Sequence, residues 1–173
     1  LLVTHEPDEA MRMADEILLM RSGQIVQRGA PYNLYNAPVD RAAAAFFSDV
    51  NILTGIVTGA LTPTPFGEFL APGLADGTAV DIIIRPQHLK IDFDRAGRGP
   101  APTARDGTAA RAFVERARFL GRESLVEFRL AEGGACLKAT VPAVFLPKPG
   151  TPMWLMLRRD RCFIFPSAAT AGS

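Results

Sequence analysis

The sequence predicts a mainly β protein that is preceded by a small α/β segment. From residue 51 onward, short runs rich in Val, Ile, Phe and Leu alternate with Gly and Pro, which is typical of a small antiparallel barrel or sandwich. Before residue 49, apolar residues recur at helical spacing and prolines stand where helices begin. We therefore expect two domains, residues 1–48 and residues 49–173.

The first 48 residues predict a strand, a helix, a hairpin and two further helices. The run "LLVT" is continuously apolar, as in a strand buried on both faces. Asp8 and Glu9 place negative charge in the first turn of the following helix, where the helix dipole favours it. The expected elements are a strand at 1–4, a helix from Pro7, a hairpin turning at Ser22-Gly23, and helices opening at Pro31 and Asp40.

The second domain predicts a series of short strands with Gly and Pro between them. The expected strands lie near 52–60, 66–70, 79–85, 110–119, 124–131, 135–141, 152–158 and 162–165. The segment 94–110 interrupts them, is rich in Gly, Pro, Ala and Arg, and shows no periodicity. We expect it to form a mobile surface loop.

Composition and charge argue against several classes of function. The chain has 173 residues, 48% of them hydrophobic, which is enough for a real core. The formal net charge is only +1, so no nucleic-acid partner is expected. No segment resembles a signal peptide or reaches the length of a bilayer-spanning helix. The two cysteines form no CxxC motif. We expect both to be reduced, buried thiols, and a disulfide between them is the alternative.

Several segments, in order, resemble ATP-binding subunits of ABC importers of the maltose and ferric-ion type. They are "VTHEPDEAMRMADEILLMRSGQIVQRGAP", "YNLYNAPVDRAAAAFF", "IIIRPQHL", "ARFLGRESLVEFRL" and "RRDRCFIFP". The resemblance implies that residues 1–48 end a nucleotide-binding domain and that residues 49–173 form an OB-like regulatory domain of the TOBE type. The segments "FFSDVNILTG", "FLGRESLV" and "VPAVFLPKPG" resemble ferric-ion importers most. Importers of polyamines, sugars or other solutes are the alternatives within the family.

The resemblance makes His5 the switch histidine, which in the intact ATPase would reach the γ-phosphate of ATP and the attacking water. ATP and Mg²⁺ would be the cofactors of that parent protein. The motif G-x-x-x-x-G-K-[ST] is missing here, since none of the three lysines follows a glycine, and the Asp-Glu pair and the Ser-Gly-Gly signature are missing as well. We expect a C-terminal fragment that is catalytically inactive and needs no cofactor.

The family resemblance also implies partners and a location. A homodimer is expected, together with membrane-spanning permease subunits in the full complex. The parent protein would be cytoplasmic and peripheral on the inner face of the plasma membrane. An apolar opening strand with unpaired edges independently favours pairing with a second copy.

Other residues could bind a small ligand. Arg85, Arg116 and Arg158 are candidates for holding an anion or metabolite, which would make the domain a ligand sensor. His88 follows Arg85-Pro86 in an expected structured turn, and no metal site is expected because the Cys and His residues lack ligand spacing. A nucleic-acid-binding barrel would need exposed aromatic side chains, but the spacing of Phe113 and Phe119 predicts that both lie in the core.

Overall fold

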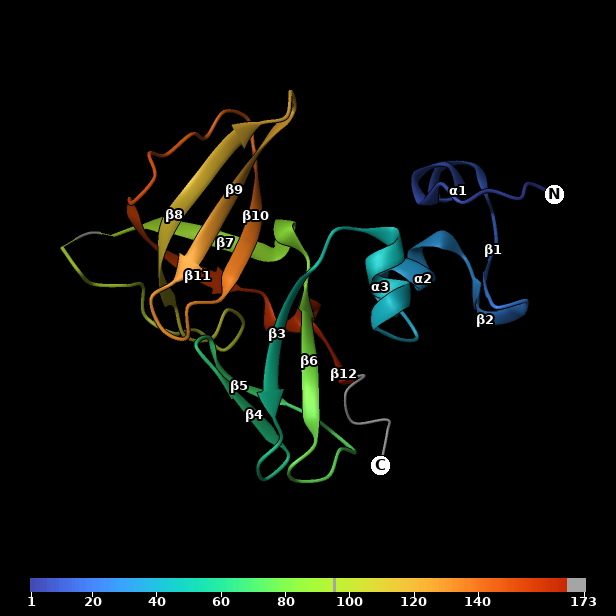
Figure 1. Ribbon diagram of the computed structural model, residues 1–173, viewed down its shortest axis with the longest axis horizontal. Coiled ribbons are helices and arrows are strands. Elements are labelled where there is room, and N and C mark those ends of the chain that lie inside the picture. The colour runs from blue at the N-terminus through green and yellow to red at the C-terminus, as the bar shows by residue number, and fades with distance from the viewer. Residues whose placement is uncertain (95, 168–173) are drawn as a thin grey trace. The chain divides into compact units, whose positions relative to one another are not determined.

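The chain divides into two compact units, Leu1–Val50 and Asn51–Ser173. The computed structural model describes residues 1–94 and 96–167 (Figure 1). The second unit is mainly β and OB-like, with a curled antiparallel sheet, as the sequence predicts. Arg95 and residues 168–173, which belong to the expected loop and the expected second domain, lie outside the described residues.

The first unit confirms the predicted helices and the predicted hairpin. Its elements are α1 (Pro7–Met13), β1 (Ile17–Arg21), β2 (Gln24–Gly29), α2 (Pro31–Asn36) and α3 (Arg41–Phe47). Ser22 and Gly23 both have positive φ, 50° and 78°, as a tight hairpin turn with the right-handed twist of its strands requires. Ile17, Leu34 and Phe47 form the buried centre of this unit.

The prediction of a buried strand at residues 1–4 is wrong. These residues have no strand assignment, and Leu1, Leu2 and Val3 are exposed. A strand needs a neighbour for its backbone hydrogen bonds, and no described strand lies beside this segment. Residues 1–4 therefore offer no strand edge that would favour pairing with a second copy.

The second unit contains two main sheets. Its strands are β3 (Asn51–Ile56), β4 (Leu61–Thr64), β5 (Gly67–Leu70), β6 (Ala79–Ile84), β7 (Leu89–Phe93), β8 (Ala110–Phe119), β9 (Glu123–Leu130), β10 (Cys136–Pro142), β11 (Pro152–Leu157) and β12 (Phe163–Pro166). The five-stranded sheet has the order β10-β9-β8-β11-β7, and the three-stranded sheet has the order β12-β6-β3. Both sheets contribute to one hydrophobic core, which includes Ile82 and Ile84 of β6 and Val126 and Phe128 of β9.

The sequence did not predict two of the strands, β4 and β7. The segment of β4 contains Pro63, and a proline argues against a strand because it cannot donate a backbone hydrogen bond. Its partner is β5, in a two-stranded sheet. The segment of β7 alternates apolar and charged residues over only five positions, and it directly follows the expected turn at Arg85–His88.

The segment 94–110 is tied to the domain at several points. The Trp154 indole nitrogen donates a hydrogen bond to Asp94 at 3.1 Å, and Arg111 forms an ion pair with the same carboxylate at 3.0 Å. Near the other end of the segment, the backbone amide of Thr108 donates to the carbonyl of Phe66. The mobility of this loop stays a prediction.

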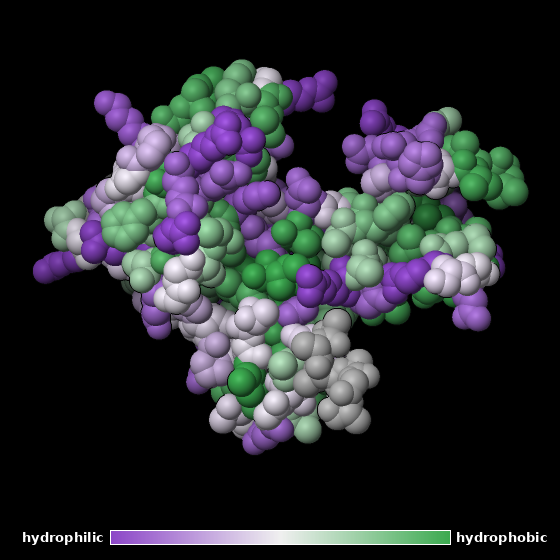
Figure 2. Space-filling view, viewed as in Figure 1, coloured by the Kyte–Doolittle hydropathy of each residue, from purple (hydrophilic) through white to green (hydrophobic). Residues whose placement is uncertain are grey.

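The prediction that Phe113 and Phe119 lie in the core is wrong. Their exposed fractions are 38% and 46%. On β8 the buried face is formed by Ala110, Ala112 and Val114, so Phe113 points to the other face. The register of β8 against β9 shifts between Val114 and Arg116, so spacing of six residues no longer predicts the face. Figure 2 shows apolar surface around the β8–β9 turn, at the top of the larger unit.

Candidate functional site

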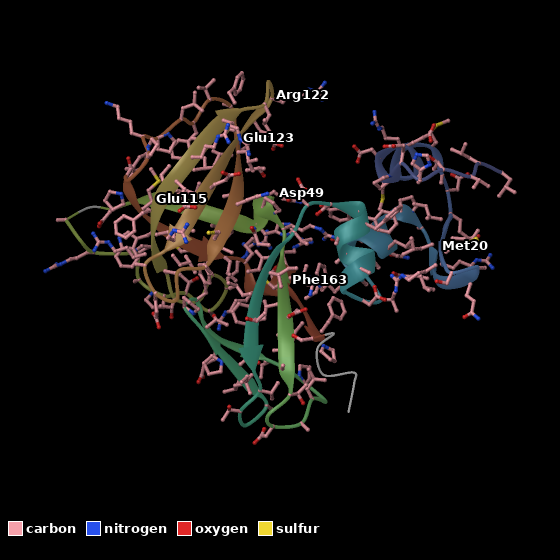
Figure 3. All side chains as sticks on the ribbon, viewed as in Figure 1. Met20, Asp49, Glu115, Arg122, Glu123 and Phe163 are labelled. Atoms are coloured by element: carbon pink, nitrogen blue, oxygen red, sulfur yellow. The ribbon has the colours of Figure 1, made fainter. Side chains whose placement is uncertain are left out.

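The candidate site begins where β6 ends. Arg85 follows β6 and leads into the 3₁₀ turn η1 (Pro86–His88), which confirms the structured turn predicted for this segment. The Arg85 side chain is only 1% exposed, and its guanidinium lies 5.2 Å from the centroid of the Phe163 ring on β12. This distance is typical of a cation–π contact, so part of the environment of Arg85 is an aromatic face. Phe163 is labelled in Figure 3.

A second 3₁₀ turn lies against the first. It is η2 (Arg159–Arg161), which connects β11 to β12. The backbone amide of Arg158 donates a hydrogen bond to the carbonyl of His88 at 3.3 Å. The Arg158 side chain forms an ion pair with Asp160, at 2.7 Å between Nη2 and Oδ2. The two turns, about seventy residues apart in the sequence, thus form one local structure.

A third segment, residues 103–107, joins these turns. The backbone amide of Arg159 donates to the carbonyl of Arg105 at 3.3 Å, and Nη2 of Arg159 donates to the carbonyl of Ala104 at 2.9 Å. Lys90, just beyond η1, forms an ion pair with Asp106 at 2.8 Å. Loop and turns are therefore held together by both backbone and side-chain contacts.

We call the charged side chains of the segments 85–90, 103–107 and 158–161 the basic cluster. It consists of the cations Arg85, Lys90, Arg105, Arg158, Arg159 and Arg161 and the carboxylates Asp106 and Asp160, with His88 among them. Six cations against two carboxylates is a strong local excess in a chain whose formal net charge is +1. Like charges this close are costly unless counter-ions or ligands accompany them.

The charges of the cluster affect the protonation of His88. Burial and the positive charges of Arg85, Arg161 and Arg158 lower the pKa of His88 below its ordinary value, and Asp160 opposes them. The ring nitrogen Nδ1 is buried without a hydrogen-bond partner among the described residues. Both features favour a neutral imidazole at pH 7.

The structure brings three of the predicted site residues together. Arg85, His88 and Arg158 all belong to the basic cluster, whereas Arg116 is exposed on β8, opposite Glu127 in the register. His5 lies in the first unit and its side chain is 95% exposed. Its Nε2 lies 3.8 Å from a carboxylate oxygen of Glu6. The role of His5 at the γ-phosphate stays a prediction for the complete subunit.

Sequence analysis missed the other members of the cluster. The sequence alone does not single out Lys90, Arg105, Arg159 and Arg161, although the segment "RRDRC" contains three arginines in four positions. What the sequence does not reveal is that the loop 103–107 closes on this segment. Among the described residues no group of three or more His, Cys, Asp and Glu side chains could hold a metal ion.

Comparison with known proteins identifies the domain that carries the cluster. A family model described as "TOBE domain" matches residues 82–165. This range runs from within β6 to within β12 and contains the whole basic cluster. In the described part of the chain, no helix is long and apolar enough to cross a membrane.

Three curated relatives are import ATP-binding proteins. The chain is 31% identical over 104 residues to "Spermidine/putrescine import ATP-binding protein PotA" of Mesorhizobium japonicum, covering 55% of this chain and 29% of the relative. It is 37% identical over 92 residues to the protein of the same name from Acetivibrio thermocellus, covering 51% and 26%. It is 29% identical over 156 residues to "Fe(3+) ions import ATP-binding protein FbpC" of Serratia marcescens, covering 90% and 42%. The chain thus spans less than half the length of each of these relatives.

A solved structure supports the fold. The cytoplasmic molybdate-binding protein ModG, in a molybdate-bound form, superimposes with a TM-score of 0.52 at 16% sequence identity. The match covers 68% of this chain and 96% of the ModG chain. The chain thus contains a TOBE domain over residues 82–165 and is similar to ATP-binding proteins of importers.

Proposed function

We propose that this chain is the C-terminal regulatory portion of the ATP-hydrolysing subunit of an ABC importer for ferric ion. The observation that carries the proposal is the similarity to the ferric-ion importer protein of Serratia marcescens, which covers 90% of the chain and so extends over both units. The polyamine importer proteins match at slightly higher identity, but over 55% and 51% of the chain. A polyamine importer is therefore the second candidate.

In this role the TOBE domain would bias the open-to-closed equilibrium of an ATPase pair. Such a bias needs only a few kcal/mol of differential contact between the two states. ATP and Mg²⁺ would be bound by the complete subunit, with His5 at the γ-phosphate. Permease subunits would hold that subunit at the inner face of the membrane, on the cytoplasmic side.

A homodimer is part of the proposal. The β1–β2 sheet has only two strands, so each strand has an edge that is not paired within its sheet. Open edges of this kind favour pairing with another chain. Sedimentation velocity of the chain at several concentrations tests this proposal. A single species with the mass of one chain, 18.6 kDa, at every concentration would contradict it.

The importer assignment is tested by reconstituting the complete subunit with its cognate permease in proteoliposomes. The expected result is ATP hydrolysis that rises when binding protein loaded with ferric ion is added, and that does not respond to binding protein loaded with spermidine. If only binding protein loaded with spermidine stimulates ATP hydrolysis, the transported solute would be a polyamine and not ferric ion. Failure of the subunit to assemble with any permease would reject the importer role itself.

A further inference from the structure

We propose that His88 is the trigger of an acid-sensitive latch in the second unit. The latch consists of the turns η1 and η2 and the hydrogen bonds that join them, and protonation of the His88 imidazole opens it. This device goes beyond the proposed importer role and does not depend on it. It uses only residues of the TOBE domain.

His88 holds the two turns together through its main chain. Its amide donates a hydrogen bond to the carbonyl of Arg85 at 2.9 Å, which closes η1, and its carbonyl accepts from the amide of Arg158 at 3.3 Å, which joins η1 to the start of η2. The amide of Arg161 donates to the carbonyl of Arg158 at 2.9 Å and closes η2. A displacement of His88 therefore disturbs both turns.

The closed latch offers no acceptor for a second proton on the His88 ring. The side chain is partly buried, and Nδ1 is buried without a hydrogen-bond partner among the described residues. A neutral imidazole has one N–H donor and one acceptor, whereas the protonated ring has two donors. A buried donor without an acceptor costs free energy. Protonation therefore leaves an unsatisfied N–H at Nδ1 for as long as the latch stays closed.

The charges around His88 also oppose its protonation. Burial and the positive charges of Arg85, Arg161 and Arg158 lower the pKa of His88, and Asp160 opposes them. The other charged groups of the surrounding segments are Lys90, Arg105, Asp106 and Arg159, and the Cys162 thiol, with a pKa of about 12, stays neutral. Two carboxylates offset only part of this charge, through the ion pairs Lys90–Asp106 and Arg158–Asp160.

Acid must therefore favour the open latch. The pKa of His88 in the folded chain lies below its ordinary value of 6.5, so the ring binds a proton more tightly once opening exposes it to water. The stability that the closed latch gains from a neutral ring is complete above about pH 6.5 and is lost as the pH falls toward the folded pKa. Because one proton is taken up, opening increases by at most about tenfold for each pH unit in this window.

The segment freed by opening is η2 with the strand that follows it. Strand β12 has four residues and is an edge strand, paired only with β6 in its sheet (Figure 1). Its first residue, Phe163, is the one that lies against the guanidinium of Arg85. The five-stranded sheet keeps its own hydrogen-bonded neighbours, so we expect a local opening and no global unfolding.

Amide hydrogen exchange of the full chain measures this opening residue by residue. The reporters are the amides of Arg158 and Arg161, which donate within the latch, and the reference is the amide of Val114, which donates to the carbonyl of Thr151. Between about pH 7.5 and pH 5.5, after correction for intrinsic rates, the protection of the reporters should fall about three- to tenfold, while that of Val114 should change less than about twofold. The imidazole signals of His88 in NMR spectra should titrate over the same range as the fall.

Matched variants assign the effect to His88. His88→Gln cannot take up the proton, so the corrected protection of the reporters should no longer depend on pH. His5→Gln removes the other histidine of the chain, whose side chain is 95% exposed, and should leave the fall as it is. Arg161→Gln removes a charge that opposes protonation and should shrink the fall at least about twofold, whereas Arg122→Gln, at the exposed β8–β9 turn, should leave it unchanged.

Three results would overturn the proposal. One is constant protection of the reporters in the native chain over this pH range. Another is a fall in His88→Gln as large as in the native chain, which would assign the effect to a different group. The last is a parallel loss of protection at Val114, which would mean global acid unfolding. Should His88→Gln fail to fold, the arginine variants decide, and equal effects of Arg161→Gln and Arg122→Gln reject the latch.

Discussion

The carboxamide of Asn51 pairs with both backbone groups of Lys138, a residue 87 positions away in the sequence. Its Nδ2 donates to the Lys138 carbonyl at 2.7 Å, and its Oδ1 accepts from the Lys138 amide at 2.7 Å. The side chain thus imitates a strand neighbour for β10, which is an edge strand of the five-stranded sheet. Asn51 opens β3, so one residue connects the two main sheets of the TOBE-containing unit.

Replacing this side chain should destabilise the second unit. Asn51→Ala leaves the amide and the carbonyl of Lys138 without their partner, and Asn51 itself is buried, so water does not readily replace it. We expect the free energy of unfolding to fall by about 2 kcal/mol. Urea denaturation followed by the fluorescence of Trp154, the one tryptophan of the chain, measures this change.

The matched control is Lys138→Ala. Asn51 contacts only the backbone of Lys138, and the lysine side chain is exposed, so this variant should change the stability by less than about 0.5 kcal/mol. Equal losses in the two variants would show that the amide pairing is not the source of the stability.

Gly99 lies directly against the ring of Trp154. A Cβ added at Gly99 would come within 2.7 Å of two ring atoms, so Gly99→Ala must push the loop away from the indole. We expect a red shift of the Trp154 emission as water reaches the ring. Gly133→Ala faces open space but has a positive φ of 72°, so it should cost stability without moving the emission. An unshifted emission in Gly99→Ala would contradict this packing.

Elements with a strong local signal were predictable from the sequence. The hairpin at Ser22-Gly23 needs two positive φ angles that its residues tolerate, and the helix after Asp40 has a capping side chain that accepts from the amide of Ala43 at 2.8 Å. Elements that form only when a segment distant in the sequence pairs with them were not predictable. Residues 1–4 have the composition of a buried strand, but composition does not supply a neighbouring strand.

The candidate site was predictable only in part, for the same reason. Arg85 and His88 are neighbours in the sequence, so a structured turn at "RPQH" could be expected. The association of this turn with η2 and with Arg105 depends on backbone hydrogen bonds between segments that are far apart in the chain. Arg116 looked equivalent to Arg158 in the sequence, yet it lies on the exposed face of β8.

The two cysteines should react at very different rates. Cys136 is exposed on β10, which corrects the expectation of two buried thiols, whereas burial and the charge of Asp160 raise the pKa of Cys162 to about 12. Because the thiolate is the reactive form, Cys162 should resist alkylation until the protein unfolds. Labelling with iodoacetamide should modify one thiol in the native chain and two in denaturant, and Cys136→Ser should abolish the native reaction. Two rapid native modifications would contradict the burial of Cys162.

Asp40 links the hairpin to α3 in the first unit. Its carboxylate accepts from Arg21 at 2.7 Å and 3.1 Å and also caps α3 at the amide of Ala43. The hydrogen bonds from Arg21 and from the helix amides lower the pKa of Asp40 below its ordinary value of 3.8. A lowered pKa means that the unfolded chain binds the proton more tightly. The stabilisation by Asp40 is therefore complete above about pH 4 and is lost as the pH falls through the folded pKa.

Two substitutions at Asp40 separate the cap from the charge. Asp40→Ala removes both and should destabilise α3 by about 1 kcal/mol near neutral pH. Asp40→Asn keeps an oxygen for the Ala43 amide but cannot ionise, so α3 should remain while its acid sensitivity disappears. Amide hydrogen exchange of Ala43 and Ala44, measured between about pH 3 and pH 6 and corrected for intrinsic rates, reads the local stability directly. An acid dependence in Asp40→Asn as steep as in the native chain would show that another carboxylate controls this helix.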